Sequence, residues 1–115
     1  MRRTITFYKT VDGNCPVEEF LDSLPGKVVQ KIVWVLKLIE DLDRIPSSYL
    51  KKLPGTEEIW ECRAQFGSNI YRIFGFIPRH SEMILTHGYV KKTNKIPVAE
   101  IERAEAYRRE YLTRR

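Results

Sequence analysis

Three strand-like runs follow one another closely in the second half of this 115-residue chain. They cover Ile59 to Gln65, Asn69 to Ile77 and Met83 to Val90. Each run is rich in the β-branched and aromatic residues that favour strands. The links at residues 66–68 and 78–81 have the length and the Gly and Pro content of hairpin turns. This spacing predicts an antiparallel β meander.

Helices are predicted on both sides of the meander. Apolar residues recur at helical spacing from Lys27 to Asp43. A short helix from Pro16 to about Leu24 precedes this segment, and the two should form an antiparallel hairpin on one face of the sheet. A strand is predicted from Thr4 to Lys9, and a final helix from Pro97 to about Leu112.

The predicted order of elements is β-α-α-β-β-β-α, which is an α+β arrangement. No repeat, linker or low-complexity tract interrupts it, so we expect one domain over residues 1–115. No apolar run approaches the roughly 20 residues that a membrane-spanning helix needs. The N-terminal arginines are not followed by an apolar segment, so no signal peptide is predicted. We therefore expect a cytoplasmic protein without a membrane partner.

Binding of a metal or cofactor is not expected. Cys15 and Cys62 belong to no CxxC motif and should stay reduced in the cytosol. A site built from Cys62, His80 and His87 would match no zinc-binding spacing. The sequence also contains no Walker-type glycine loop and no nucleophile elbow.

Positive charge is concentrated in one part of the chain, whose formal net charge is +5. Glu82 is the only acidic residue between Cys62 and Ala99. The same stretch contains these basic residues: Arg63, Arg72, Arg79, Lys91, Lys92 and Lys95. One region of the surface should therefore carry a positive potential suited to nucleic acid or to an acidic protein segment. A generally solvated basic surface is the alternative that charge alone leaves open.

Two arginines on the predicted strands are the first candidates for a site. Alternation along the first meander strand places Arg63 on an open face, near Glu61. Arg72 is unusual because both faces of its strand are mostly apolar, and a charge inside a sheet is costly unless it is paired or used. Two explanations stay open for Arg72, namely an ion pair with Glu61 across the hairpin and direct binding of a ligand.

The third meander strand supplies further candidates. Met83, Leu85, His87 and Tyr89 alternate with other residues and are expected to share a face. His87 is a candidate acid or base, although a half-buried structural role is the favoured interpretation. Tyr89 lies near the strand end, where it either fills the core or contributes to a site.

Lysines flank the meander at both ends. Lys91, Lys92 and Lys95 follow its last strand, and Lys51 and Lys52 precede its first. Lys91 and Lys92 would point to opposite sides if the strand continued through them. Lys51 and Lys52 are candidates for contacting a sugar-phosphate backbone, although we expect one of the two to be an ordinary surface lysine.

Together these residue types suggest cleavage of RNA without a metal. In that reaction the ribose 2′-hydroxyl attacks the adjacent phosphorus and the 5′-oxygen leaves. The reaction needs removal of one proton, stabilisation of charge on the phosphoryl oxygens and delivery of another proton. Arginine suits the second task because its fork matches two phosphate oxygens, and lysine or tyrosine can do the first when neighbouring cations lower its pKa. The sequence lacks the carboxylate clusters of a two-metal nuclease.

Three strings in this region resemble the RelE/ParE toxin superfamily, and most closely its HigB-like, phage-derived branch. They run from Ile59 to Arg63 (IWECR), from Ile70 to Phe74 (IYRIF) and from Ile84 to Pro97 (ILTHGYVKKTNKIP). The match extends from about Lys51 to Tyr111. It implies the RelE-like fold and a toxin of a type II toxin–antitoxin module. Such toxins cut mRNA during translation on the ribosome, and an antitoxin that often has a helix-turn-helix domain neutralises them.

The resemblance also implies roles for single residues. Arg63 matches an arginine that binds phosphate in related toxins, and Arg72 matches the arginine of the second string. Lys91 and Lys92 match a lysine pair that would stabilise the transition state or act as acid or base. Tyr89 stands where the branch usually has phenylalanine, so its hydroxyl is a doubtful catalytic group.

The predicted site therefore has two groups of residues. The catalytic residues are Arg63, Arg72, Lys91 and Lys92, and the substrate-binding residues are Lys51, Lys52, Tyr89 and Lys95. Two other functions stay open. A ParE-like toxin would use the same fold to poison DNA gyrase through protein contact, and a small nucleic-acid-binding module would use the basic residues without cleavage.

Overall fold

The computed structural model describes residues 3–91 and 95–114. Its elements are β1 (Thr4–Phe7), α1 (Pro16–Asp22), α2 (Gly26–Asp41), β2 (Leu50–Lys52), β3 (Trp60–Phe66), β4 (Asn69–Arg79), β5 (Glu82–Lys91) and α3 (Val98–Thr113). The predicted α+β class is confirmed, and the predicted elements occur in the predicted order. One element was missed, because the short strand β2 lies where the sequence indicated only an approach to the sheet.

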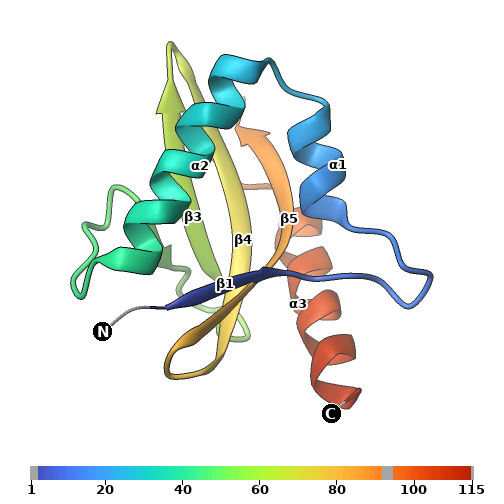
Figure 1. The fold of residues 1–115 in the computed structure, drawn as a ribbon. Helices are drawn as coiled ribbons and strands as arrows, with labels where there is room; N and C mark the ends of the chain where they lie inside the picture. Colours follow the sequence, from blue (N-terminus) through green and yellow to red (C-terminus); the bar gives the residue numbers. More distant parts are fainter. Residues whose placement is uncertain (1–2, 92–94, 115) are drawn as a thin grey trace.

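The strands form a mixed sheet in the order β1-β5-β4-β3-β2 (Figure 1). Neighbouring strands from β2 to β5 are antiparallel, so the predicted meander is confirmed as β3-β4-β5. Strand β1 runs parallel to β5. Parallel pairing is possible there because two helices and the rest of the meander separate the strands in sequence, which leaves ample chain for the crossover.

Helices α1 and α2 cover one face of the sheet, as predicted (Figure 1). α1 begins at Pro16, a residue that suits the first helical turn because the amide it lacks would have no partner there. The buried side chains of α2 recur at helical spacing and join a core cluster with β3, β4 and β5. These side chains are Val28, Ile32, Val35, Leu36 and Ile39.

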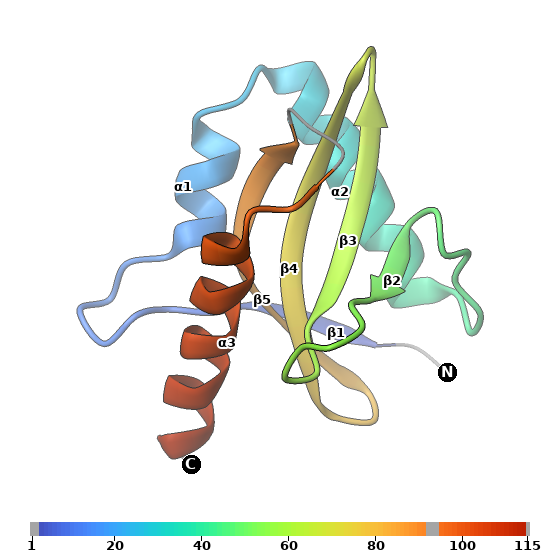
Figure 2. The same cartoon turned by 180° about the vertical axis from the view of Figure 1, so that it is seen from behind.

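Helix α3 lies on the opposite face and covers only part of it (Figure 2). It packs against β4 and β5. Ala104 is fully buried in a cluster with Ile59 and Phe74, and Tyr107 and Tyr111 pack on a second cluster further along the helix. The part of this face formed by β2 and β3 is not covered by the helix. That uneven cover leaves Lys51 of β2 exposed and Arg63 of β3 partly exposed on this face.

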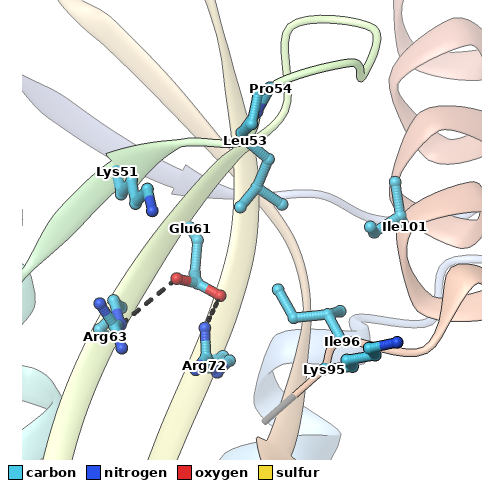
Figure 3. Close-up of a pocket in the computed structure, with 9 residues that line it drawn as sticks. All are labelled: Lys51, Leu53, Pro54, Glu61, Arg63, Arg72, Lys95, Ile96 and Ile101. Atoms are coloured by element: carbon cyan, nitrogen blue, oxygen red, sulfur yellow. Dashed lines mark hydrogen bonds and ion pairs between the residues drawn. The ribbon is translucent and has the colours of Figure 1, made fainter.

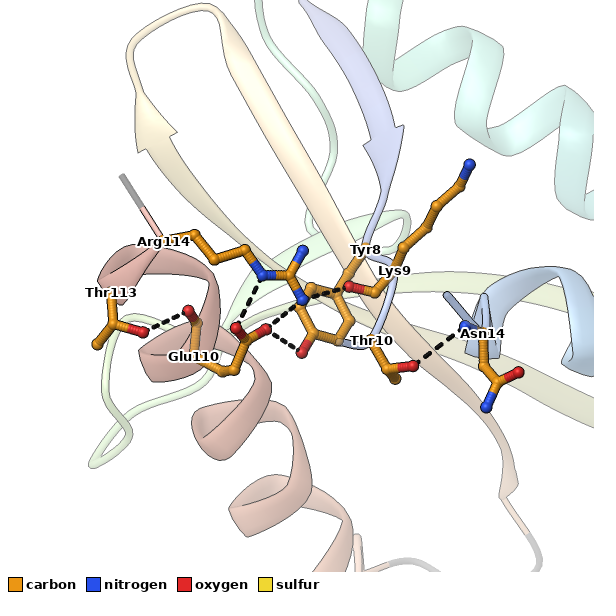
Figure 4. A network of polar contacts seen from close by, with 7 residues as sticks. All are labelled: Tyr8, Lys9, Thr10, Asn14, Glu110, Thr113 and Arg114. Carbon is orange, nitrogen blue, oxygen red and sulfur yellow. Dashed lines mark hydrogen bonds and ion pairs between the residues drawn. The ribbon is translucent and has the colours of Figure 1, made fainter. Parts of the chain in front are cut away.

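A polar network fastens the last turn of α3 to the chain that follows β1 (Figure 4). The buried Tyr8 hydroxyl donates to Glu110 Oε1 at 2.5 Å, and Arg114 Nε donates to Glu110 Oε2 at 2.7 Å. Arg114 Nη2 also donates to the Lys9 carbonyl oxygen at 2.6 Å. Burial and the bond to Glu110 raise the pKa of Tyr8 to about 12, so its hydroxyl stays protonated and donates.

Strand β5 contains a β-bulge. Phe74 pairs with His87 whereas Gly75 pairs with Leu85, so Thr86 is an extra residue on β5. Gly75 suits this position because an added Cβ would lie 2.6 Å from the carbonyl oxygen of Ile84. The chain can therefore approach this closely only where a side chain is absent.

The bulge overturns one prediction about the third meander strand. Met83 and Leu85 pack in the core beneath α1 and α2. His87 and Tyr89 instead face α3, where the His87 ring lies 5.9 Å from the Tyr107 ring. The expectation that these four residues share a face is wrong, because one extra residue reverses the alternation of a strand.

Candidate functional site

Strand register brings the two predicted arginines together. Arg63 on β3 pairs with Arg72 on β4, and Arg72 pairs in turn with Tyr89 on β5. Glu61 is two residues before Arg63 on the same strand, and Lys51 of β2 is its partner in register. Since paired residues share a face, all of these positions lie on the side of the sheet that α3 only partly covers.

A buried carboxylate joins the two arginines (Figure 3). Glu61 is 1% exposed and Arg72 is 4% exposed. Arg72 Nη1 donates to Glu61 Oε2, and Arg63 Nε lies 3.4 Å from Glu61 Oε1. The ion pair proposed for Arg72 and Glu61 is confirmed. Each carboxylate oxygen therefore faces one guanidinium, which holds both arginines in place.

The three charged groups do not cancel one another. One carboxylate faces two guanidinium groups, so the cluster keeps an excess positive charge. The Arg63 side chain is 28% exposed, which leaves part of its fork open to a ligand. Among the described residues, the Nε atoms of Arg63 and Arg72 are buried without a hydrogen-bond partner. Because these two atoms are enclosed and Arg63 Nε already faces Glu61 Oε1, a phosphate oxygen would contact the exposed part of the Arg63 fork.

The cluster forms the floor of a hollow of about 420 Å³ (Figure 3). Its lining residues come from β2, the following loop, β3, β4, the segment before α3, and α3 itself. They are Lys51, Leu53, Pro54, Glu61, Arg63, Arg72, Lys95, Ile96 and Ile101. Four of these lining residues are cations and one is an acid, so the hollow suits an anionic ligand. Its apolar lining residues can contact the uncharged part of the same ligand.

The flanking lysines are divided between different places. Lys51 and Lys95 line the hollow. Lys52 follows Lys51 on β2 and therefore points to the other face, where its Nζ atom lies 2.7 Å from Glu58 Oε2 in an exposed ion pair. Lys91 is the last residue of β5, but its side chain and all of Lys92 lie outside the described residues.

Tyr89 is beside the hollow in register but is not among its lining residues. It is partly buried and packs on the cluster that contains Phe74 and Ala104. The Tyr89 ring therefore has a packing role beneath α3. Tyr89 stays a predicted substrate-binding residue only through its position opposite Arg72.

His87 is fully buried, and more so than the half-buried state expected from the sequence. It is 1% exposed, and its ring lies 5.1 Å from the Phe74 ring. Nε2 lies 3.1 Å from Glu100 Oε1, and Nδ1 lies 3.2 Å from Thr86 Oγ1. These contacts fasten β5 to the first turns of α3. Because His87 is enclosed and outside the hollow lining, the structure supports the structural interpretation.

Stability should fall as the pH is lowered, because His87 is hard to protonate in the folded state. Burial first, and then the charge of Arg103, lower its pKa from 6.5 to about 3. Between these two values the unfolded chain binds the proton more readily than the folded chain. The contribution of His87 is thus present above pH 6.5 and is lost as the pH falls toward 3. We expect a loss of about 2 kcal/mol in unfolding free energy between pH 7 and pH 5.

Urea denaturation at pH 7 and pH 5 measures this loss. His87→Gln should show a smaller difference between the two pH values, and the exposed His80→Gln should keep the difference of the unchanged protein. Carboxylates that titrate in the same range are common to all three proteins and therefore cancel. An equal difference in all three proteins would show that His87 does not cause the loss.

Sequence reasoning missed the apolar part of the hollow. Leu53 and Pro54 belong to the loop after β2, and Ile96 precedes α3. No periodic pattern marks residues of this kind, because they lie outside regular elements. Ile101 lies within the predicted last helix, so its helical spacing was the one available signal.

Cys62 and His87, two of the residues considered for a metal site, lie on opposite faces of the sheet. Among residues 3–91 and 95–114, no three His, Cys, Asp or Glu side chains are grouped in a way that could hold a metal ion. Cys62 packs in the core beneath α2, whereas His87 is on the other face of the sheet. Burial raises the pKa of the Cys62 thiol to about 12, so it is an inert core residue.

Among residues 3–91 and 95–114, no helix combines the length and the apolar character that crossing a membrane would require.

A family model described as "Phage derived protein Gp49-like" matches residues 19–109. This family is phage-derived and toxin-like, and it is known in toxin–antitoxin contexts. No curated protein matches the sequence. The matched segment contains β2 to β5 and every residue that lines the hollow. The chain therefore belongs to the Gp49-like family of phage-derived proteins.

Proposed function

We propose that this protein is the toxin of a type II toxin–antitoxin module and that it cuts mRNA without a metal ion. The observation that carries the proposal is the pair of arginines held by one buried carboxylate at the floor of a cationic hollow. Membership of a toxin-like family and the resemblance to HigB-like toxins add to it.

The arginines would supply charge stabilisation. The open part of the Arg63 fork would bind the non-bridging oxygens of the phosphate, where negative charge grows as the 2′-oxygen attacks. Arg72 is hydrogen-bonded to Glu61, so it would act mainly by holding Glu61 and Arg63 in position and by adding to the positive potential of the hollow. Lys51 and Lys95 line the same hollow and would bind the flanking backbone.

Two proton transfers complete the reaction. The 2′-oxygen forms a bond to phosphorus as its proton passes to a base, and the bond from phosphorus to the 5′-oxygen breaks as that oxygen receives a proton. The products are a 2′,3′-cyclic phosphate and a free 5′-hydroxyl. We assign these transfers to Lys91, the last residue of the strand that carries Tyr89, and to Lys92, the next residue in the sequence.

The acid in the hollow argues against a metal-assisted route. Glu61 is the one carboxylate among the described lining residues, and both of its oxygens already face guanidinium groups. A divalent cation would have to displace an arginine and stand among four cationic side chains. Charge stabilisation by arginine is therefore the chemistry that these residues favour.

The substrate and partners follow from the resemblance to HigB-like toxins. The substrate would be mRNA bound to a translating ribosome in the cytoplasm. The partner that neutralises the toxin would be an antitoxin with a helix-turn-helix domain. Both assignments are testable with purified protein.

The deciding experiment is primer extension on an mRNA that is being translated in a cell extract. Addition of the protein should produce discrete new 5′ ends, and prior addition of the antitoxin should prevent them. Intact mRNA together with inhibited DNA supercoiling would replace this proposal by a gyrase-directed toxin. Intact mRNA with unaffected supercoiling would leave only a binding module.

A further inference from the structure

A second, smaller hollow lies on the other side of Arg63. It has a volume of about 120 Å³ and is lined by Ser48, Arg63, Gln65 and Ile70. Arg63 also lines the larger hollow. The two hollows thus share Arg63, and a ligand that binds Arg63 can extend into both.

The second hollow lies beside an open edge of the sheet. β2 pairs with β3 only as far as Leu50 and Cys62, and one further bond joins the Arg63 amide to the Tyr49 carbonyl oxygen at 2.8 Å. β3 continues to Phe66 and extends past β2 (Figure 2). Backbone groups two residues apart point the same way, so the amide and carbonyl of Gln65 face the edge that β2 leaves open.

The chemistry of this hollow suits a nucleobase. The exposed Gln65 side chain has one amide donor group and one carbonyl acceptor, and Ser48 adds a hydroxyl that can do either. Ile70 is partly buried and presents apolar surface, against which a planar ring can pack. Gln65 follows Arg63 by two residues, or about 6.6 Å along the strand. A phosphate at Arg63 and the base of the adjoining nucleotide can span that distance.

We propose that the second hollow is a subsite for the base of the nucleotide on the 3′ side of the phosphate bound at Arg63. The ligand is therefore single-stranded RNA of at least two nucleotides, and Gln65 and Ser48 contact its base. This inference rests on the proposed function, because it takes the anion at Arg63 to be an RNA phosphate. It adds a place where the sequence around the cut can be recognised.

The test is equilibrium binding of short RNAs that cannot be cleaved. The probes are a nucleoside 3′-phosphate and the corresponding 2′-O-methyl dinucleotide, and titration calorimetry gives their affinities. The dinucleotide should bind about tenfold more tightly, as one added hydrogen-bonded contact would allow. Combined Ser48→Ala and Gln65→Ala substitution should remove most of this gain and leave mononucleotide binding unchanged.

Two exposed residues outside both hollow linings provide the matched control. Combined Ser47→Ala and Gln30→Ala changes the same residue types next to the subsite and on α2, and it should not alter either affinity. Equal binding of both probes, with mononucleotide binding still lost in Arg63→Ala, would overturn the subsite and leave the proposed function standing. Failure of both probes to bind would overturn the subsite and the proposed RNA function together.

Discussion

Arg63→Ala should lower the rate of mRNA cleavage by about 10²- to 10³-fold, the usual effect of removing one donor from a site that stabilises developing negative charge. Arg63 is the more exposed of the two arginines and lines both hollows. Its loss would leave Glu61 paired with Arg72, so the buried carboxylate keeps a partner. The unfolding free energy should therefore change by only about 1 kcal/mol or less.

Two further variants serve as controls for this prediction, one for the position of the arginine and one for its charge. Arg79→Ala removes an exposed arginine at the end of β4 and should leave cleavage unchanged. Arg63→Lys keeps the charge but loses the planar fork, so its rate should lie between those of Arg63→Ala and the unchanged protein. The rates come from quantitative primer extension. A full rate in Arg63→Ala would remove this residue from the catalytic site.

Arg72→Ala should have the largest effect on stability, with a loss of about 3–5 kcal/mol in unfolding free energy. The substitution removes the principal partner of a carboxylate that is 1% exposed. Arg63 Nε faces the other carboxylate oxygen, Glu61 Oε1, at 3.4 Å, so Glu61 Oε2 would lose the hydrogen bond from Arg72. Since a domain of this size has a total stability of only about 5–15 kcal/mol, the variant should also be less soluble.

Urea denaturation of Arg72→Ala, with a second variant for comparison, measures this effect. Glu61→Leu combined with Arg72→Met removes both buried charges and fills the space with apolar side chains, so it should recover much of the lost stability. Arg63 can then turn toward solvent, because it is already partly exposed. If Arg72→Ala were as stable as the unchanged protein, the buried pair would contribute little to the fold.

The fold was largely predictable because its elements are long and regular. The β3-β4-β5 meander follows from three runs of β-forming residues, and α2 follows from apolar residues at helical spacing. β2 is only three residues long, which is too short for a periodic signal. The bulge at Thr86 was also missed, because alternation assumes that no strand carries an extra residue.

The site was predictable where it depends on alternation within a strand. Arg63, Glu61 and Arg72 were placed correctly because cross-strand partners in a hairpin share a face. The residues that loops contribute to the site were not predictable. Pro54 and Ile96 reach the hollow from separate loops. Lys52, which was predicted to bind substrate, forms an ion pair with Glu58 and does not line the hollow. Such positions depend on tertiary packing, which a single sequence does not specify.

The network around Tyr8 makes the far end of α3 matter to the rest of the molecule. Tyr8 is 3% exposed, and its hydroxyl bonds to Glu110, which Arg114 holds in turn. A premature stop codon before Glu110, or a protease that trims the final turn, would take away both groups and leave a buried hydroxyl without its acceptor. Shortened forms of the protein should therefore be tested for folding before any loss of activity is attributed to the residues proposed to cut RNA.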